Sequence, residues 1–143
     1  MPGPPADPPI GLRLSRTARA VTQAFERELA AAGGSVATWQ VLLLVRGGSW
    51  GAQARIADAL GVTPATLTHH LAALERRGLV RRWREPGNRR VQQVELTPEG
   101  EALFGRLRAV AVAHDARLRA ALDDEELDRL GALLDRLRAA VEA

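Results

Sequence analysis

The sequence predicts a mainly α-helical chain with one small β-hairpin, an α+β fold. Three observations lead to this prediction. Apolar side chains recur at three- and four-residue steps in both terminal parts of the chain, which is the spacing of one helix face. Thr-Pro pairs and glycines separate the helical stretches. Near the middle, two short strand-like runs flank the turn residues PGN.

The chain has 143 residues, enough for one domain with a buried core. Its longest apolar run, residues 41–45, is far too short to cross a bilayer, so no membrane association is expected. The start MPGPPADPPI lacks the basic and apolar regions of a signal peptide, and we therefore expect a cytoplasmic protein. Without cysteine, the chain has no disulfide, thiol chemistry or cysteine-ligated zinc.

Five prolines in residues 1–9 predict a flexible, extended tail. A helix follows and stops at AAGG (31–34), where glycine suits the C-terminal cap. Its apolar stripe consists of Leu14, Ala18, Val21, Phe25 and Leu29. The stretch VATWQVLLLVRGG predicts a second helix, apolar nearly all round and therefore buried, that closes at Gly47-Gly48.

A third, short helix is expected from about Ala52 to Leu60, followed by the turn GVT. The fourth helix opens with Thr63 as its cap and Pro64 in the first helical position, and Gly78 stops it. Next, LVRRWRE (79–85) and RVQQVEL (90–96) predict the two strands of a hairpin with an arginine-rich tip.

Two further helices complete the chain. The first opens at Thr97-Pro98, and the last has Asp123 as its cap with Glu126 in the capping-box position. Their stripes are Phe104, Leu107, Ala111, His114 and Leu118, and then Leu127, Leu130, Leu134, Leu137 and Val141. Each helix alone fits an intramolecular core. Three such helices around a small central module instead favour a dimer interface, so a homodimer is expected.

All twenty basic residues are arginine, and a GC-rich genome would explain this total. Their clustering is more informative. Residues 76–90 hold seven arginines and one glutamate, a net charge of +6, whereas the whole chain carries only +3. Such local repulsion is unfavourable unless a polyanion relieves it, as expected of a face that binds nucleic acid.

The stretch RIADALGVTPATLTHHLAAL fits a helix-turn-helix. Ala57 is small where two helices would cross, and Gly61 allows the turn between them. Ile56, Leu60, Val62, Leu67 and Leu71 supply the core between the helices. This arrangement leaves small and polar side chains on the outer face of the second helix, where methyl and hydroxyl groups suit close approach to base edges. These side chains are Thr63, Ala65, Thr66, Thr68 and His69.

From about Leu12 to the C-terminus the chain resembles the multiple-antibiotic-resistance regulator (MarR) family, through this helix-turn-helix, LERRGLVRR, PGNRR and VELTPEG. The 60–105 stretch is the most specific part. The resemblance implies a winged helix-turn-helix repressor, dimeric through its terminal helices, that binds double-stranded operator DNA. It also implies a ligand, often a small aromatic anion, between the dimer and DNA-binding parts. It divides the chain into the tail 1–9 and one domain, 10–143. Within that domain, residues 35–97 form the winged helix-turn-helix lobe, and residues 10–34 and 98–143 form the dimerisation helices.

In the family the recognition helix enters the major groove and the wing arginine, Arg90 by position, enters the minor groove. The expected DNA-binding set comprises Thr63, Ala65, Thr66, Thr68, His69, Arg76, Arg77, Arg84, Asn88, Arg89 and Arg90. Two positions depart from the family pattern. Asn88 replaces a common aspartate, so no carboxylate fixes Arg90. His70 replaces an aliphatic residue, either as a partly buried neutral histidine with one hydrogen bond or as a pH-sensitive hinge.

Arg13, Arg16 and Trp39 are the candidate effector-binding residues, since an indole face and guanidinium groups suit an aromatic acid. Trp39 also fits a plain core residue, and both arginines fit a solvated face. His69 suits either DNA contact or solvent, and His114 suits packing better than a metal site.

No catalytic motif, cofactor site or metal set is present, so no enzyme is expected. The alternative function is a ligand-independent DNA-binding protein, constitutive or architectural. Effector identity, operator sequence and the direction of regulation are not encoded in these patterns.

Overall fold

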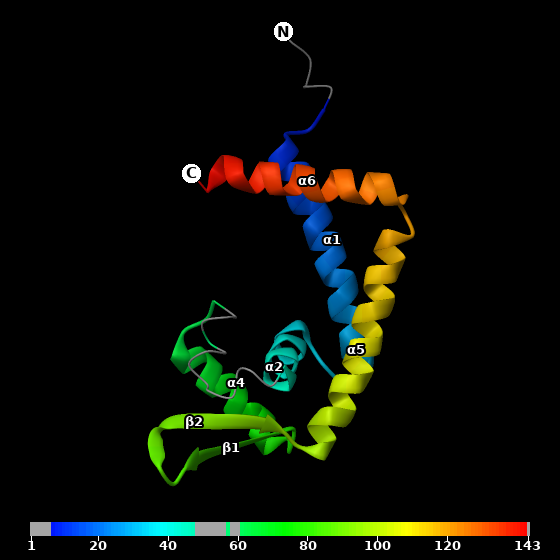
Figure 1. The fold of residues 1–143 in the computed structure, drawn as a ribbon. Helices are drawn as coiled ribbons and strands as arrows, with labels where there is room; N and C mark the ends of the chain where they lie inside the picture. The colour runs from blue at the N-terminus through cyan, green and yellow to red at the C-terminus, as the bar shows by residue number, and fades with distance from the viewer. Residues whose placement is uncertain (1–6, 48–56, 58–60, 143) are drawn as a thin grey trace. The chain divides into compact units, whose positions relative to one another are not determined.

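The computed structural model describes residues 7–47, 57 and 61–142, with the backbone alone at 88–92. Its elements, labelled in Figure 1, are α1 (Ile10–Ala31), α2 (Val36–Arg46), α4 (Pro64–Arg76), β1 (Val80–Glu85), β2 (Asn88–Leu96), α5 (Pro98–Arg119) and α6 (Asp124–Val141). This confirms the mainly helical α+β fold. The expected third helix lies outside the described residues apart from Ala57, which is helical and buried. The chain divides into two compact units, Met1–Val110 and Ala111–Ala143, with the division inside α5.

Leucine and valine side chains build the core of the first unit, as the scarcity of aromatic residues requires. α4 contributes three leucines on one face, and the first half of α5 contributes two more. The buried apolar set is Leu29, Val41, Leu42, Val45, Ala57, Leu67, Leu71, Leu74, Leu79, Val80, Val94, Leu103 and Leu107. The hairpin packs against α4 and α2, so this core holds the helix-turn-helix and the wing together (Figure 1).

The helix α2 is buried on one side only. Ser35 caps it by accepting a hydrogen bond from the Thr38 N–H at 3.1 Å. Val41 and Leu42 are buried, but Leu43 is exposed, so the expectation of a helix buried nearly all round was wrong. Consecutive apolar residues in a run of this length point to all sides of the helix, whereas the core of a small lobe covers only one of its faces. Within the described residues, no single helix has the length and apolar character of a membrane span; α1 and α2 pass that test only as a pair bent by 75°.

The recognition helix α4 begins and ends as its sequence predicts. Thr63 accepts the Thr66 N–H at 3.1 Å, and Pro64 occupies the first helical position. At the other end, Gly78 adopts φ +72°, which side chains disfavour, and its N–H bonds to the Glu75 carbonyl at 2.9 Å. The next N–H, from Leu79, bonds to the Leu74 carbonyl at 2.9 Å and completes a Schellman motif.

The wing is the antiparallel hairpin β1–β2, turned at residues 86–87. β2 begins at Asn88, two residues before the predicted strand, because Asn88 pairs with Glu85. The pairing is regular from Val80↔Leu96 to Arg84↔Gln92, after which residues 89–91 have no opposite residue. Such an irregularity bends a strand and increases its twist. The arginine-rich tip is therefore irregular in its backbone.

One junction ties both ends of the wing to α5. The Thr97 N–H bonds to the Leu79 carbonyl at 3.1 Å, and the Thr97 hydroxyl donates to the Gly78 carbonyl. The same hydroxyl caps α5 by accepting the Gly100 N–H at 3.1 Å. A β-carbon on Gly100 would lie 2.0 Å from the Leu79 carbonyl oxygen, so only glycine fits there. This contact explains the glycine of the VELTPEG stretch.

The helix α6 of the second unit opens with the predicted capping box. Asp123 accepts the Glu126 N–H at 2.8 Å, and the Glu126 carboxylate accepts the Asp123 N–H at 3.0 Å. These acidic groups suit the positive end of the helix dipole. Most of the predicted apolar stripe of α6 is exposed, namely Leu130, Leu134, Leu137 and Val141, and Leu133 beside it is exposed too.

We predict that Gly100→Ala lowers the free energy of unfolding by about 1–3 kcal/mol, the usual cost of overpacking, because the new methyl group would collide with the Leu79 backbone. Gly105→Ala is the matched control on the same helix, since no atom lies within 4 Å of its β-carbon position. It should stabilise the protein by up to about 1 kcal/mol through helix propensity. Urea denaturation of both variants measures the difference, and equal effects would contradict the close contact.

Candidate nucleic-acid interface

The outer face of α4 is the first part of the candidate interface. The five residues predicted to face outward, Thr63, Ala65, Thr66, Thr68 and His69, are all exposed, whereas Leu67 and Leu71 on the opposite face are buried. The Thr63 hydroxyl donates to the Thr66 hydroxyl at 2.9 Å. The exposed face therefore presents hydroxyl, methyl and imidazole groups.

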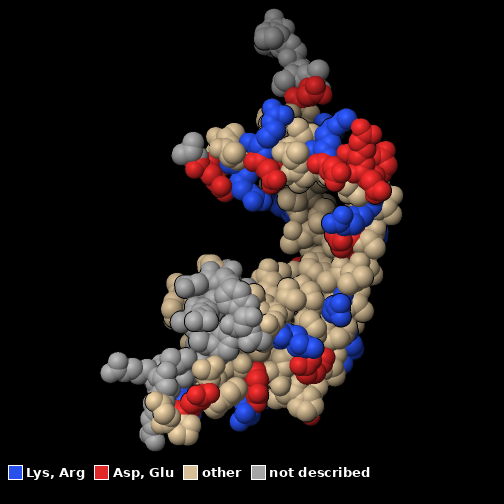
Figure 2. Space-filling model, in the orientation of Figure 1, with Lys and Arg blue, Asp and Glu red and all other residues tan. Residues whose placement is uncertain are grey.

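The basic segment is partly neutralised by acidic residues that flank it. Arg82 pairs with Glu75, at 3.3 Å between Nη2 and Oε1, and Arg81 pairs with Glu95, at 2.6 Å between Nη2 and Oε1. Over residues 75–95 the seven arginines meet three glutamates, so the net charge is +4 rather than +6. Figure 2 shows the acidic and basic groups of the whole visible face, with the residues of uncertain placement in grey. Extending the charge count from residues 76–90 to 75–95 includes Glu75 and Glu95, but it does not show which arginines they pair with.

Two arginines of the segment have packing roles. The Arg77 guanidinium donates to the Gly33 carbonyl at 3.3 Å and so links the end of α4 to the end of α1. The Arg81 guanidinium lies over the Trp83 ring, 4.5 Å from its centroid. Trp83 thus lies on the outer face of the hairpin with Arg81, since side chains two apart on a strand share a face.

The other predicted contact residues lie at the end of α4 and toward the wing tip. Arg76 and Arg84 are exposed. The backbone of β2 carries Asn88, Arg89 and Arg90 as its first three residues, directly after the turn. Their side chains lie outside the described part of the chain, so their contacts stay predictions.

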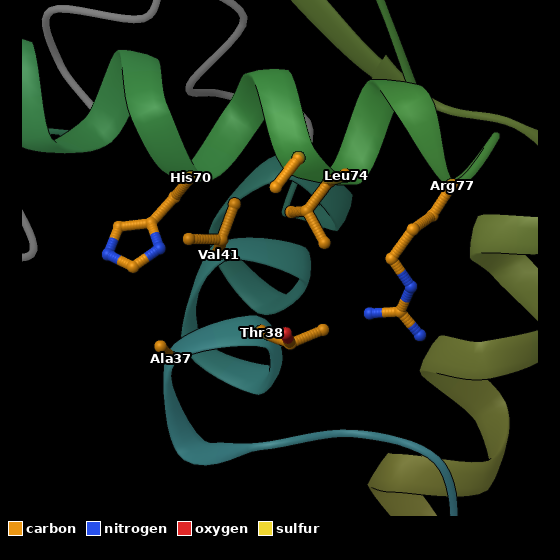
Figure 3. A pocket seen from close by; sticks show the side chains of 7 residues that line it. Ala37, Thr38, Val41, His70, Leu74 and Arg77 are labelled. Carbon is orange, nitrogen blue, oxygen red and sulfur yellow. The ribbon is translucent and has the colours of Figure 1, made fainter.

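His70 lies on the inner side of α4 and faces α2. It lines a small hollow with Thr38, Arg77 and four other residues, as Figure 3 shows. The hollow measures about 90 Å³, whereas typical ligand pockets measure about 300–1,000 Å³. His70 is half-buried, in agreement with the packing alternative, although no hydrogen bond to its ring is found among the described residues. The His69 ring lies edge-on to it, with the centroids 6.4 Å apart.

The candidate effector residues do not converge within one chain. Trp39 is half-buried against the core and stacks on Phe104, with ring centroids 5.5 Å apart. Arg13 and Arg16 are exposed near the start of α1. At about 1.5 Å per residue, Arg16 lies roughly 20 Å along the axis from Leu29, the α1 residue in the core. Among the described residues, no three His, Asp or Glu side chains form a metal-binding group, and His114 is buried.

Comparison with known proteins connects this geometry to a class of regulators. A model of the MarR family matches residues 49–91. The regulator PecS of Dickeya dadantii is 36% identical over 83 residues, which are 58% of this chain and 50% of PecS, so the match spans about half of that relative.

Solved structures match nearly the whole chain. The transcriptional repressor CouR bound to a 23-mer DNA duplex has 31% identity and a TM-score of 0.79, over 91% of this chain and 92% of CouR. CouR from Rhodococcus jostii RHA1 bound to p-coumaroyl-CoA has 29% identity and a TM-score of 0.73, over 90% of both chains. The MepR–DNA complex of S. aureus has 21% identity and a TM-score of 0.83, over 94% of this chain and 100% of MepR, and it supports the fold alone.

Proposed function

Because the chain belongs to the MarR family of transcriptional regulators, we propose that it is a homodimeric repressor that a small aromatic acid releases from a palindromic operator. The observation that carries DNA binding is the outer face of α4, where five exposed small or polar residues back onto buried leucines and precede a basic hairpin. The names of the relatives state a transcriptional role, which supports a regulator rather than an enzyme. CouR was solved on a DNA duplex, which supports this choice.

In this proposal α4 enters the major groove and the wing tip reaches the adjacent minor groove. The methyl groups of Ala65 and Thr66 suit contact with a thymine methyl, and hydroxyl groups suit base edges or phosphates. Arginine in a narrow minor groove gains from its enhanced negative potential, which is the role proposed for Arg90. The exposed Arg76 would bind the phosphate backbone without reading sequence.

We predict that Thr66→Ala and His69→Ala change which bases the protein prefers, because these side chains belong to the face that enters the groove. Arg76→Ala should instead weaken binding to all sequences alike and reduce the salt slope by about one unit, since a phosphate contact releases a counterion. Selection from a randomised duplex library, with affinities measured at several salt concentrations, separates the two effects. Unchanged preferences in both α4 variants would show that this face does not read sequence.

We also propose that the apolar stripes of α1, α5 and α6 form the homodimer interface. Ile10, Leu12 and Leu14 on α1 are exposed in the single chain, as are Val112 and Leu118 on α5 and four leucines of α6. A run of exposed leucines along one helix is unfavourable in water unless a partner covers it. Two-fold symmetry would then present the two α4 helices to half-sites about 34 Å apart.

Sedimentation should therefore find a dimer at micromolar concentration, and Leu134→Asp should shift it toward monomer by placing a charge in the interface. Ala132→Asp is the matched control, since it introduces the same single charge on nearly the opposite side of α6, two positions before Leu134. If the unmodified protein sediments as a stable folded monomer, the dimer proposal fails.

The proposed effector is a small aromatic acid. Trp39 offers an indole face and an N–H donor, and arginines such as Arg13 and Arg16 suit a carboxylate. Arg13 and Arg16 lie far along α1 from the core that holds Trp39 in the same chain. We therefore expect a ligand at Trp39 of one copy to meet the arginines of the second copy. CouR was solved with p-coumaroyl-CoA, whose aromatic acyl group supports an aromatic ligand; the carboxylate of the proposed ligand is inferred from the arginines alone.

Candidate aromatic acids should quench Trp39 fluorescence and release operator DNA over the same concentration range. The chain has three tryptophans, so Trp50 and Trp83 are replaced by Phe to isolate the Trp39 signal. Release takes only a few kcal/mol of differential affinity between the DNA-binding and released states. A ligand that quenches Trp39 without changing DNA affinity would refute the switch. Absence of binding by every aromatic acid tested would favour the ligand-independent DNA-binding protein.

A further inference from the structure

Two ion pairs hold neighbouring arginines of β1, and they differ in what they connect. Arg81 pairs with Glu95 across the hairpin, and their side chains are 60% and 48% exposed. Arg82 pairs with Glu75 of α4, and its side chain is only 14% exposed, with Glu75 at 44%. The first pair lies within the wing. The second joins the wing to the recognition helix.

The Glu75–Arg82 contact has the forked geometry of an arginine–carboxylate pair. Arg82 Nε donates to one carboxylate oxygen at 3.4 Å, and Nη2 donates to the other at 3.3 Å. Arg82 stands opposite Val94, which is buried, so it lies on the core side of the hairpin. A guanidinium largely removed from water depends on its carboxylate, because an unpaired charge there would be costly. This arginine is therefore unavailable to DNA.

The pair lies nearer the wing tip than the backbone junction at the base of the hairpin. The chain passes from α4 into β1 through the turn at Gly78, and Thr97 holds the same turn at the base of the hairpin. Arg82 is the third residue of β1 and lies nearer the tip than these contacts. A two-stranded ribbon alone is marginally stable, so a contact part of the way along it restricts how the ribbon bends.

We propose that Glu75 is a positioning residue that holds the wing at a set angle to the recognition helix, so that both reach DNA together. This inference rests on the proposed DNA-binding function. Ordering the wing in the free protein removes an entropy cost from the binding step, and affinity rises for that reason.

Neutralising Glu75 should change DNA affinity in the opposite direction from the one that simple electrostatics predicts. A glutamate beside a DNA-binding face repels phosphates, so its neutralisation should strengthen binding. If Glu75 holds the wing, Glu75→Gln should weaken binding instead. Glu95→Gln is the matched control: it makes the same chemical change in the same basic region, but it frees Arg81 without loosening the wing from α4.

The experiment compares the two variants with the unmodified protein, by operator affinity and by amide hydrogen exchange of residues 80–96 without DNA. Glu75→Gln should lower affinity about tenfold, within the range for coupled neighbouring side chains, and should speed exchange in the hairpin. Glu95→Gln should bind as tightly as the unmodified protein or more tightly, and it should speed hairpin exchange much less than Glu75→Gln does, because Arg81 and Glu95 do not connect the wing to α4. The single variant Arg82→Gln and the double variant Glu75→Gln/Arg82→Gln complete the comparison. The double variant should bind the operator at least as tightly as the weaker-binding of the two single variants, because the two residues act through each other.

Equal strengthening by both glutamate variants, with unchanged exchange, would overturn the positioning role and leave DNA binding intact. If the unmodified protein does not bind DNA, the proposed function fails, and the exchange measurement still decides whether Glu75 orders the wing. Thermal denaturation checks that each variant is folded. Should Glu75→Gln unfold the protein, Glu75→Asp replaces it. That variant keeps the charge on a shorter side chain, and it should give an intermediate exchange rate if the role is correct and an unchanged rate if it is not.

Discussion

The position of the wing depends on one backbone oxygen, the carbonyl of Leu79. It accepts the Thr97 N–H at 3.1 Å and lies where a β-carbon of Gly100 would stand. The start of β1, the end of β2 and the first turn of α5 are therefore held within one close contact. Because Leu79 also completes the helix-ending motif of α4, the recognition helix is tied to the same point. A two-stranded hairpin has little stability of its own, and this junction supplies the rigid base from which it projects.

At least three arginines of the segment make contacts within the protein. Arg77 donates to a backbone carbonyl, and carboxylates balance the charges of Arg81 and Arg82. Arg76, at the end of α4, is exposed. A basic cluster therefore overstates the number of phosphate contacts it can make, since some of its members maintain the geometry that lets the others bind.

Several apolar side chains that are exposed in the single chain would be covered by a second copy in the proposed dimer. In α6, leucines recur along an exposed stripe, while the acidic first turn and the capping box stabilise the helix by itself. In the proposed effector site, Arg13 and Arg16 would come from a second copy, because Trp39 belongs to the core region whereas these arginines lie far along α1. If a ligand acts between the dimer and DNA-binding parts, it acts by changing how two preformed lobes are spaced.

The sequence by itself determined the elements whose signals are local. Thr63 and Asp123 cap their helices, Gly78 ends α4, and leucine spacing separates the buried from the exposed face of α4, because capping, turn and periodicity effects operate within a few residues. Contacts between distant residues were decided only by the tertiary structure. The pairing of Arg82 with Glu75, the exposure of Leu43, the displaced start of β2 and the stacking of Trp39 on Phe104 all depend on which surfaces the packed core brings together. For Arg82, counting charges along the sequence cannot reveal the ion pair, because a guanidinium has the same charge whether it faces DNA or a carboxylate of its own chain.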